Sequence, residues 1–457
     1  MSEMIGRLVV LGVGSDVVGR FVVPALIGLW AAGELPGDFE VVGVARQDWD
    51  DDRVREHLAG ELDDHAPDLD ADARAAVLEL ISYQRADTTA VDELAGIFGG
   101  GEGSRKPAVV YLALPPAIFP PTIEALAELG IPEGTRLVVE KPFGEDLDDA
   151  RELNALLHRY LPEDHVHRID HFLGLNTVHD LLGLRFGNRI FEPVWNCHHV
   201  ERVDIVWDET LTLEGRAGYY DQTGALKDML QNHLLQLLAL VAMEPPVSLH
   251  EGDLRDRKAQ VLREVAPMGV EEAAEHSVRG RYTAGTIGDR EVPAYLDEDG
   301  VEPEHDTETF AAVTLGIDNW RWAGVPFQLR SGKALGRDRH EIRVRFRDVP
   351  HPSFGDPDAG ANELRMTFEP DAMSLRINIT GQAVPFTLDP VELTHTSDPA
   401  DIPPYGVVFR SVLQGDPTLS IRGDEAETSW AIVEPVLEAW RQGRVELQDY
   451  PAGSDGP

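Results

Sequence analysis

The chain has 457 residues, 42% hydrophobic and 26% charged, which is typical of a globular protein with two or three domains, and we expect two. Its 40 basic and 81 acidic side chains give a net charge of −41, which disfavours nucleic acid and anionic lipid surfaces as partners. The single cysteine, Cys197, excludes an intrachain disulfide, and no run of about 18 apolar residues could span a membrane, so we expect a protein of the reducing cytoplasm.

Strand-like and helix-like segments alternate through the first third of the chain. Apolar runs at residues 7–12, 39–45, 106–114 and 136–140 predict strands. Helix-spaced apolar residues at 16–32 and 117–129 predict helices between them. This alternation favours a parallel, doubly wound sheet, so we expect an N-terminal Rossmann-type domain.

A glycine-rich turn separates the first predicted strand from the first predicted helix. The turn reads Leu11-Gly12-Val13-Gly14-Ser15-Asp16. Its glycines would let backbone amides approach a pyrophosphate at the N-terminus of the helix. The run is not a strict G-x-G-x-x-G, so a purely structural turn is the alternative interpretation.

Arg46 follows the second predicted strand directly. Rossmann domains usually place an acidic residue there to bind the ribose 2′-hydroxyl of NAD, whereas an arginine suits the 2′-phosphate of NADP. The sequence therefore favours NADP as the cofactor. An ordinary surface arginine is the alternative.

Lysine is rare in this chain, which has only Lys106, Lys141, Lys227, Lys258 and Lys333. Lys141 stands at the end of a predicted strand, in the run Glu140-Lys141-Pro142-Phe143-Gly144. In doubly wound folds ligands bind at this carboxyl edge of the sheet, so we expect Lys141 to contact a ligand. Alternatively, the run only terminates the strand through Pro142.

The rest of the chain has a different pattern. A long apolar helix is predicted over residues 219–243 and an amphipathic helix over 424–440. Strands are predicted at 310–317, 341–346, 364–368 and 374–379, and residues 452–457 read as a disordered end. We therefore expect a Rossmann domain over residues 1–172 and a larger domain, with helices and a mostly antiparallel sheet, over residues 173–457.

Two histidines lie in apolar surroundings. His171 follows Asp170, and His233 lies on the long apolar helix. Burial would keep His233 neutral unless a carboxylate such as Asp170 restored its basicity. A buried core histidine is the alternative, and spacing alone does not decide between the two.

These runs, in this order, resemble the glucose-6-phosphate dehydrogenase family from about residue 8 to residue 440. The runs that carry the resemblance are residues 11–20, Ala45-Arg46, 111–116, Glu140-Lys141-Pro142-Phe143-Gly144, Arg168-Ile169-Asp170-His171, 184–188, 214–221, 228–233, 320–327 and 330–333. The resemblance implies oxidation of D-glucose 6-phosphate to 6-phospho-D-glucono-1,5-lactone with hydride transfer to NADP, the first step of the pentose phosphate pathway. It also implies a homodimer or homotetramer and no bound metal.

The resemblance assigns a role to each candidate residue. His233 would be the general base that removes the C1 hydroxyl proton, and Asp170 would stabilise its imidazolium. The implied substrate-binding residues are Lys141, His171, Glu209, Asp228 and Lys333. The implied cofactor-binding residues are Gly12, Gly14, Ser15, Asp16, Arg46 and Lys141. Carboxylates suit ring hydroxyls and cations suit a phosphate.

The chain departs from the family in its expected phosphate site. Phe172 and Leu175 stand where the family usually has a tyrosine and a lysine, and Gly14-Ser15 stands where it commonly reads Ser-Gly. These changes leave two alternatives open. One is a related enzyme for a different sugar or sugar phosphate, and the other is a non-catalytic NADP-binding regulator.

Overall fold

We describe the protein from a computed structural model, which covers residues 4–98, 106–213, 215, 217–351, 353–354, 360–381 and 387–457. Two residues of the family-like run 214–221, Glu214 and Arg216, lie outside these ranges. The chain forms two compact units. Unit 1 contains Met1–Leu175, Pro246–Arg255 and Ala400–Glu427, and unit 2 contains Asn176–Pro245, Asp256–Pro399 and Thr428–Pro457. The expected domain boundary after residue 172 stays a prediction, because two later segments group with unit 1.

Unit 1 is built on a seven-stranded sheet. In spatial order its strands are β17 (Ser420–Ile421), β6 (Val166–Ile169), β5 (Arg136–Val139), β4 (Val109–Leu112), β1 (Arg7–Leu11), β2 (Glu40–Ala45) and β3 (Ile81–Arg85). All neighbours are parallel except β17, which pairs antiparallel with β6. The strand order reverses between β1 and β4, as in a doubly wound fold. The predicted Rossmann-type sheet is therefore confirmed.

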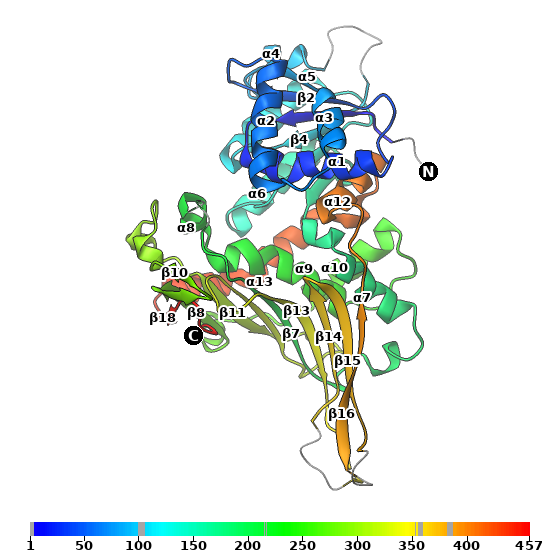
Figure 1. Ribbon diagram of the computed structural model, residues 1–457, viewed down its shortest axis with the longest axis vertical. Coiled ribbons are helices and arrows are strands. Elements are labelled where there is room, and N and C mark those ends of the chain that lie inside the picture. The colour runs from blue at the N-terminus through cyan, green and yellow to red at the C-terminus, as the bar shows by residue number, and fades with distance from the viewer. Residues whose placement is uncertain are drawn as a thin grey trace. The chain divides into compact units, whose positions relative to one another are not determined.

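Helices cover this sheet, and Figure 1 shows α1, α2 and α3 packed along it. The α-helices of unit 1 are α1 (Val23–Ala31), α2 (Asp51–His65), α3 (Ala71–Glu79), α4 (Val91–Ala95), α5 (Phe119–Leu129), α6 (Leu147–Tyr160) and α12 (Pro404–Gln414). A short π-helix, η1 (Val18–Val22), precedes α1, and the 3-10 turns are η2 (Pro116–Ile118), η3 (Glu163–His165), η4 (His171–Gly174) and η9 (Pro417–Leu419).

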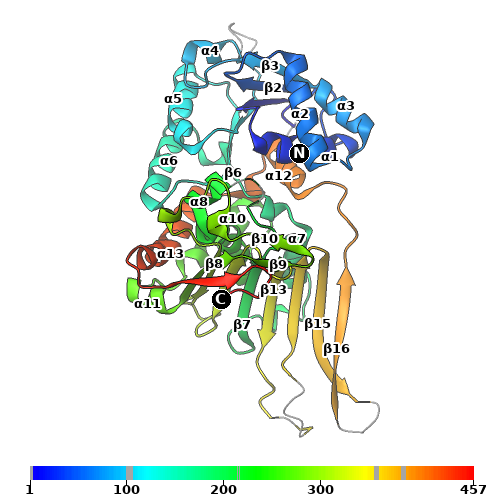
Figure 2. The ribbon, with the colours of Figure 1, turned by 60° about the vertical axis from the view of Figure 1, so that its left-hand side comes forward.

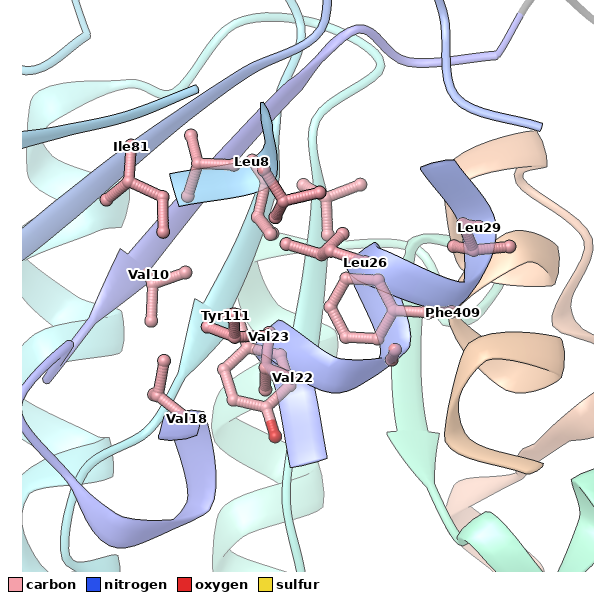
Figure 3. Close-up of a cluster of buried hydrophobic side chains, with 14 of the residues drawn as sticks. Leu8, Val10, Val18, Val22, Val23, Leu26, Leu29, Ile81, Tyr111 and Phe409 are labelled. Atoms are coloured by element: carbon pink, nitrogen blue, oxygen red, sulfur yellow. The ribbon is translucent and has the colours of Figure 1, made fainter. Parts of the chain in front are cut away.

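The core of unit 1 joins segments that are far apart in the sequence. Parallel strands are buried on both faces, which explains why β1 reads as an unbroken apolar run. Phe409 of α12 is fully buried in the same cluster, and its ring centroid lies 5.7 Å from that of Tyr111. Figure 3 shows the Phe409 ring beside Leu26 of α1. The late return of the chain therefore completes the hydrophobic core of the Rossmann unit.

Unit 2 contains a nine-stranded sheet. In spatial order its strands are β16 (Leu388–Thr396), β15 (Asp371–Thr380), β14 (Glu363–Phe368), β13 (Arg339–Phe346), β7 (Val200–Asp208), β12 (Phe327–Gly332), β11 (Phe310–Leu315), β8 (Ser277–Thr283) and β18 (Leu447–Pro451). Only the β7–β12 and β8–β18 pairs are parallel. Strands β7, β13, β15 and β16 can be followed in Figure 2. The mostly antiparallel sheet that we predicted is confirmed.

The remaining elements of unit 2 are mainly helical. They are α7 (Asn176–Phe186), η5 (Glu192–Val194), α8 (Ala217–Ala225), η6 (Leu226–Leu234), α9 (Leu235–Ala242), α10 (Glu251–Arg263), α11 (Val270–Glu275), η7 (Tyr295–Asp297), η8 (Pro303–His305) and α13 (Gly423–Arg441), with a small hairpin of β9 (Gly285–Ile287) and β10 (Arg290–Val292). The first residues of α10 and of α13 group with unit 1. Within the described ranges, no helix combines the length and apolar character needed to cross a bilayer.

Two predictions for this part of the chain were wrong. The single helix expected over residues 219–243 is broken at Gly224, whose φ of 70° and ψ of 170° are not helical, and continues as the π-helix η6. The end expected to be disordered is ordered, because its polar backbone finds partners. The Ser454 carbonyl accepts from the Gly336 amide at 2.8 Å, and the Asp455 carbonyl accepts from Arg330 at 2.6 Å.

Candidate functional site

Unit 1 has a pocket of about 360 Å³ at the carboxyl edge of its sheet. The segments that follow β1, β2, β3 and β4 all contribute to it. Its lining residues are Gly12, Gly14, Ser15, Ala45, Arg46, Gln47, Ala86, Asp87, Thr88, Thr89, Ala113, Leu114, Pro115 and Ile118. This is the edge at which doubly wound folds bind nucleotides, beside the point where the strand order reverses.

The glycine turn is shaped for close approach of another molecule. Gly12 has a φ of 94°, and a Cβ added there would lie 2.2 Å from the Ala113 carbonyl oxygen, so only glycine fits. Ser15 Oγ is buried and has no hydrogen-bond partner among the described residues. An orphaned hydroxyl beside a glycine turn that leads into a helix fits the pyrophosphate of a dinucleotide.

Of the predicted cofactor residues Arg46 and Asp16, only Arg46 is among the residues that line this pocket. Arg46 is exposed on the pocket wall, and it lies close enough to Asp87 to lower the pKa of that carboxyl, after the larger effect of hydrogen bonds from Thr89. Asp16 is not among the described residues that line the pocket, and its carboxylate lies 3.4 Å from Arg20. The contribution of Asp16 to cofactor binding stays a prediction.

Sequence reasoning missed one wall of this pocket. Asp87, Thr88 and Thr89 follow β3, a strand that we did not predict because its sequence, Ile-Ser-Tyr-Gln-Arg, is largely polar. The signal available was the Asp-Thr-Thr run, which is typical of a turn after a strand. The Asp87 carboxylate accepts from the Thr89 amide at 3.0 Å and from its hydroxyl at 2.8 Å.

Lys141 follows β5 and stands next to the half-buried carboxyl of Glu140. Burial raises the pKa of Glu140 to about 7, and the Tyr111 hydroxyl donates a hydrogen bond that partly opposes this rise, as does the charge of Lys141. The Tyr111 hydroxyl also lies 2.6 Å from that of Tyr405, on α12. This network joins Glu140, the neighbour of Lys141, to β4 and α12.

Asp170 and His171 follow β6 in the same unit. Asp170 is only 3% exposed, and its Oδ1 accepts from the Phe172 amide at 2.9 Å, which caps the short turn η4. His171 is half-buried, with its ring centroid 6.2 Å from that of Tyr405. Phe172 is buried, whereas Leu175 is half-buried at the end of the turn. The two apolar replacements therefore lie within one short turn of His171.

Two of the predicted residues in unit 2, Glu209 and Lys333, form an ion pair. Lys333 Nζ lies 2.7 Å from Glu209 Oε2, and the two side chains are 15% and 19% exposed. The Glu209 amide donates to the Gly332 carbonyl at 2.8 Å, and the Lys333 amide donates to the Thr309 carbonyl at 2.9 Å. Both side chains therefore extend from anchored backbone at the ends of β7 and β12, with a donor and an acceptor side by side.

Asp228 and His233 both lie on the π-helix η6. His233 is 2% exposed, and Asp228 is half-buried. Tyr220 lies nearby. Burial raises its pKa well above the usual range, and the carboxylates of Asp228, Glu308 and Glu209 raise it further. The sequence did not identify Tyr220 or Glu308, because only the fold brings them to this cluster.

The predicted residues thus form two sets of complementary chemistry. Unit 1 carries the glycine turn, Arg46, Lys141, Asp170 and His171. Unit 2 carries Glu209, Asp228, His233 and Lys333. Within the first set, the glycine turn and Arg46 line the pocket of unit 1. The second set provides carboxylates, an ammonium and a buried imidazole, the groups that bind and deprotonate a polyol.

Comparisons with known proteins agree over the whole chain. Two protein-family models match it, described as "Glucose-6-phosphate dehydrogenase, NAD binding domain" over residues 9–180 and "Glucose-6-phosphate dehydrogenase, C-terminal domain" over residues 182–457. A glucose-6-phosphate 1-dehydrogenase of Zymomonas mobilis is 37% identical, with 100% of this chain and 97% of the relative covered. One of Mycolicibacterium smegmatis is 38% identical, with 98% and 94% covered.

Solved structures are similar over the same length. A glucose-6-phosphate dehydrogenase in complex with its substrate glucose 6-phosphate superposes with a TM-score of 0.90 at 31% identity, covering 100% of this chain and 96% of the other. The glucose-6-phosphate 1-dehydrogenase of Mycobacterium avium gives a TM-score of 0.87 at 33% identity, again covering 100% and 96%. Both units are therefore shared with these enzymes.

Proposed function

Because the chain belongs to the glucose-6-phosphate dehydrogenase family, we propose that it oxidises D-glucose 6-phosphate to 6-phospho-D-glucono-1,5-lactone with NADP, the first step of the pentose phosphate pathway. The observation that carries the proposal is the set of groups in unit 2, where the Glu209–Lys333 pair and the helix of Asp228 and His233 are arranged around Tyr220. Support also comes from the relatives, which carry the name of this activity.

The chain's own residues perform the proton chemistry. His233 removes the proton of the C1 hydroxyl through a ring nitrogen, and Asp170, by its resemblance to the family, stabilises the imidazolium that results. Glu209 and Asp228 accept hydrogen bonds from ring hydroxyls, and Lys333 donates one. His171 donates a hydrogen bond to the substrate phosphate, and Lys141 contributes a positive charge that cofactor and substrate share. NADP, when bound, supplies the acceptor for the C1 hydride.

The residues of unit 1 suit NADP in three ways. Ser15 Oγ and the backbone around Gly12 and Gly14 bind the pyrophosphate, with Asp16 at the start of the following helix. Arg46 binds the 2′-phosphate, the group that distinguishes NADP from NAD. Lys141 is shared between cofactor and substrate.

We also propose a cytoplasmic homodimer or homotetramer. The assembly rests on the resemblance to the family, and the compartment rests on the single cysteine.

A steady-state assay of the purified chain tests the function. It compares NADP with NAD, each with glucose 6-phosphate, unphosphorylated glucose and other hexose phosphates. We expect the highest specificity constant with glucose 6-phosphate and NADP. A higher value with another sugar would favour the related-enzyme alternative. NADP binding by calorimetry without product formation from any sugar would favour the regulator.

A further inference from the structure

The helix that carries Asp228 and His233 begins at a sharp break. Gly224 adopts a φ of 70° and a ψ of 170°, a conformation that is essentially restricted to glycine. Residues after the break start a new helical segment, so their first amides have no partner within the helix. The position of the catalytic helix therefore depends on what binds these amides.

Glu308 binds two of the amides after the break, those of Ala225 and Leu226. The Ala225 amide donates to the Glu308 carbonyl at 3.2 Å, and the Leu226 amide donates to Glu308 Oε1 at 2.9 Å. On the other side of the break, the Thr307 hydroxyl donates to the Asp221 carbonyl at 2.5 Å. Residues 307–308 therefore bridge the two sides of the kink.

The Glu308 carboxylate fits this place closely. The side chain is 8% exposed, and a Cβ added at Gly224 would lie 2.5 Å from Oε1. Burial raises the pKa of Glu308 to about 7. The hydrogen bond from the Leu226 amide and the charges of Arg279 and Lys227 lower this pKa and only partly offset the rise. A buried carboxyl costs stability, so its position against helix amides indicates a specific role.

The type of helix determines the angle about its axis between Asp228 and His233. Asp228 and His233 are five residues apart, which in an α-helix would turn them about 140° away from each other. In a π-helix, whose wider turns join residues i and i+5 by hydrogen bonds, residue i+5 is rotated away from residue i by much less than it is in an α-helix. The observed π-helix η6 (Leu226–Leu234) thus brings Asp228 and His233 closer to a common face than an α-helix would.

The same segment also reaches the lysine. Thr309 directly follows Glu308, and its carbonyl accepts from the Lys333 amide at 2.9 Å, while its hydroxyl lies 2.9 Å from the Tyr450 hydroxyl. The Tyr450 hydroxyl in turn donates to the Lys333 carbonyl at 2.7 Å. One three-residue segment, Thr307-Glu308-Thr309, is therefore hydrogen-bonded to both the helix of His233 and the backbone of Lys333.

From these contacts we infer that Glu308 is a positioning residue, whose hydrogen bonds to the Ala225 and Leu226 amides set the register of η6 and so the direction in which Asp228 and His233 face the sugar. Glu308 acts through the helix and touches neither substrate nor cofactor. The inference rests on the proposed function for the identity of the substrate, but its structural part concerns the helix alone.

Two conservative variants separate the hydrogen bond from the charge. Glu308→Gln keeps an oxygen acceptor at the same reach and removes the charge. Glu308→Asp keeps the charge and shortens the side chain by one methylene, so the carboxylate no longer reaches the Leu226 amide from the same backbone. Glu341→Asp is the matched control, because Glu341 is 4% exposed in β13 of the same unit and binds Arg343 and Arg365.

We expect Glu308→Asp to lower kcat with glucose 6-phosphate by about fivefold to a hundredfold, the effect of leaving the buried Leu226 amide without its acceptor, with an unchanged KM for NADP. Glu308→Gln should rescue turnover to within about threefold of wild type, and Glu341→Asp should match wild type. Wild-type turnover in Glu308→Asp, or equal losses in Asp and Gln variants, would overturn the inference.

Hydrogen exchange keeps the test independent of the proposed function. The amides of residues 226–234 should exchange faster in Glu308→Asp than in wild type or Glu308→Gln, measured on the full chain by mass spectrometry. If wild type fails to oxidise glucose 6-phosphate, the proposed function fails, while faster exchange confined to Glu308→Asp still supports the positioning role. Equal exchange in all variants would contradict it.

Discussion

Replacing Lys333 by methionine removes the ammonium of the proposed sugar site while keeping a side chain of similar length. Lys333 Nζ lies 2.7 Å from Glu209 Oε2, and only 15% of the lysine side chain is exposed. A charge-assisted hydrogen bond to a substrate hydroxyl contributes about 1.5–3 kcal/mol. We therefore expect KM for glucose 6-phosphate to rise about tenfold to a hundredfold, since about 1.4 kcal/mol corresponds to a factor of ten.

The assay measures kcat and KM for glucose 6-phosphate at saturating NADP, together with the KM for NADP and the unfolding temperature. The KM for NADP should stay unchanged. The unfolding temperature should fall, because the largely buried Glu209 carboxylate loses its ion-pair partner. Lys106→Met is the matched control, since Lys106 is an exposed lysine of unit 1. A KM for glucose 6-phosphate within about twofold of wild type would refute the reasoning, as it would leave no room for the lost hydrogen bond.

Three further predictions follow from unit 1. Arg46→Ala should raise KM for NADP about tenfold to a hundredfold with little change for NAD, and steady-state titration of both cofactors that showed equal weakening would remove Arg46 from the 2′-phosphate site. Leu175→Lys, alone or with Phe172→Tyr, should raise the specificity constant for glucose 6-phosphate about tenfold or more relative to unphosphorylated glucose, whereas no gain would favour a pocket rebuilt for another substrate. Burial raises the pKa of Glu140 from 4.5 to about 7, so the stability linked to its proton is full below about pH 4.5 and is lost as the pH rises through about 7. The unfolding temperature of Glu140→Gln minus that of wild type should therefore be more positive at pH 8 than at pH 5. A difference that does not change with pH would contradict the raised pKa of Glu140.

The Rossmann unit was predictable because its strands are buried on both faces. Strands such as β1 then appear as continuous apolar runs between helical segments. The sequence did not reveal β3, whose residues are largely polar, or β17, which has only two residues, Ser420–Ile421. The contribution of α12 to the core was also invisible, because it depends on packing across nearly 300 residues of chain.

The candidate residues were found by resemblance, but their local geometry was not. The apolar pattern of residues 219–243 predicts a helix but does not tell whether its hydrogen bonds are of the α or the π type. The π-helix η6 could therefore not be predicted from the sequence. Its form accompanies the break at Gly224 and the hydrogen bond from Leu226 to Glu308, a residue 82 positions later. The orphaned hydroxyl of Ser15 likewise depends on how the glycine turn meets the neighbouring strands.

The turnover of His233→Asn with glucose 6-phosphate and NADP, compared with that of wild type, tests the central claim most directly. A general base contributes about 10²-fold or more to the rate and little to ground-state binding. We therefore predict active wild type, a loss of about 10²-fold or more in kcat for the variant, and a nearly unchanged KM for glucose 6-phosphate. A variant that keeps more than about a tenth of wild-type turnover would contradict the assignment of His233 as the base.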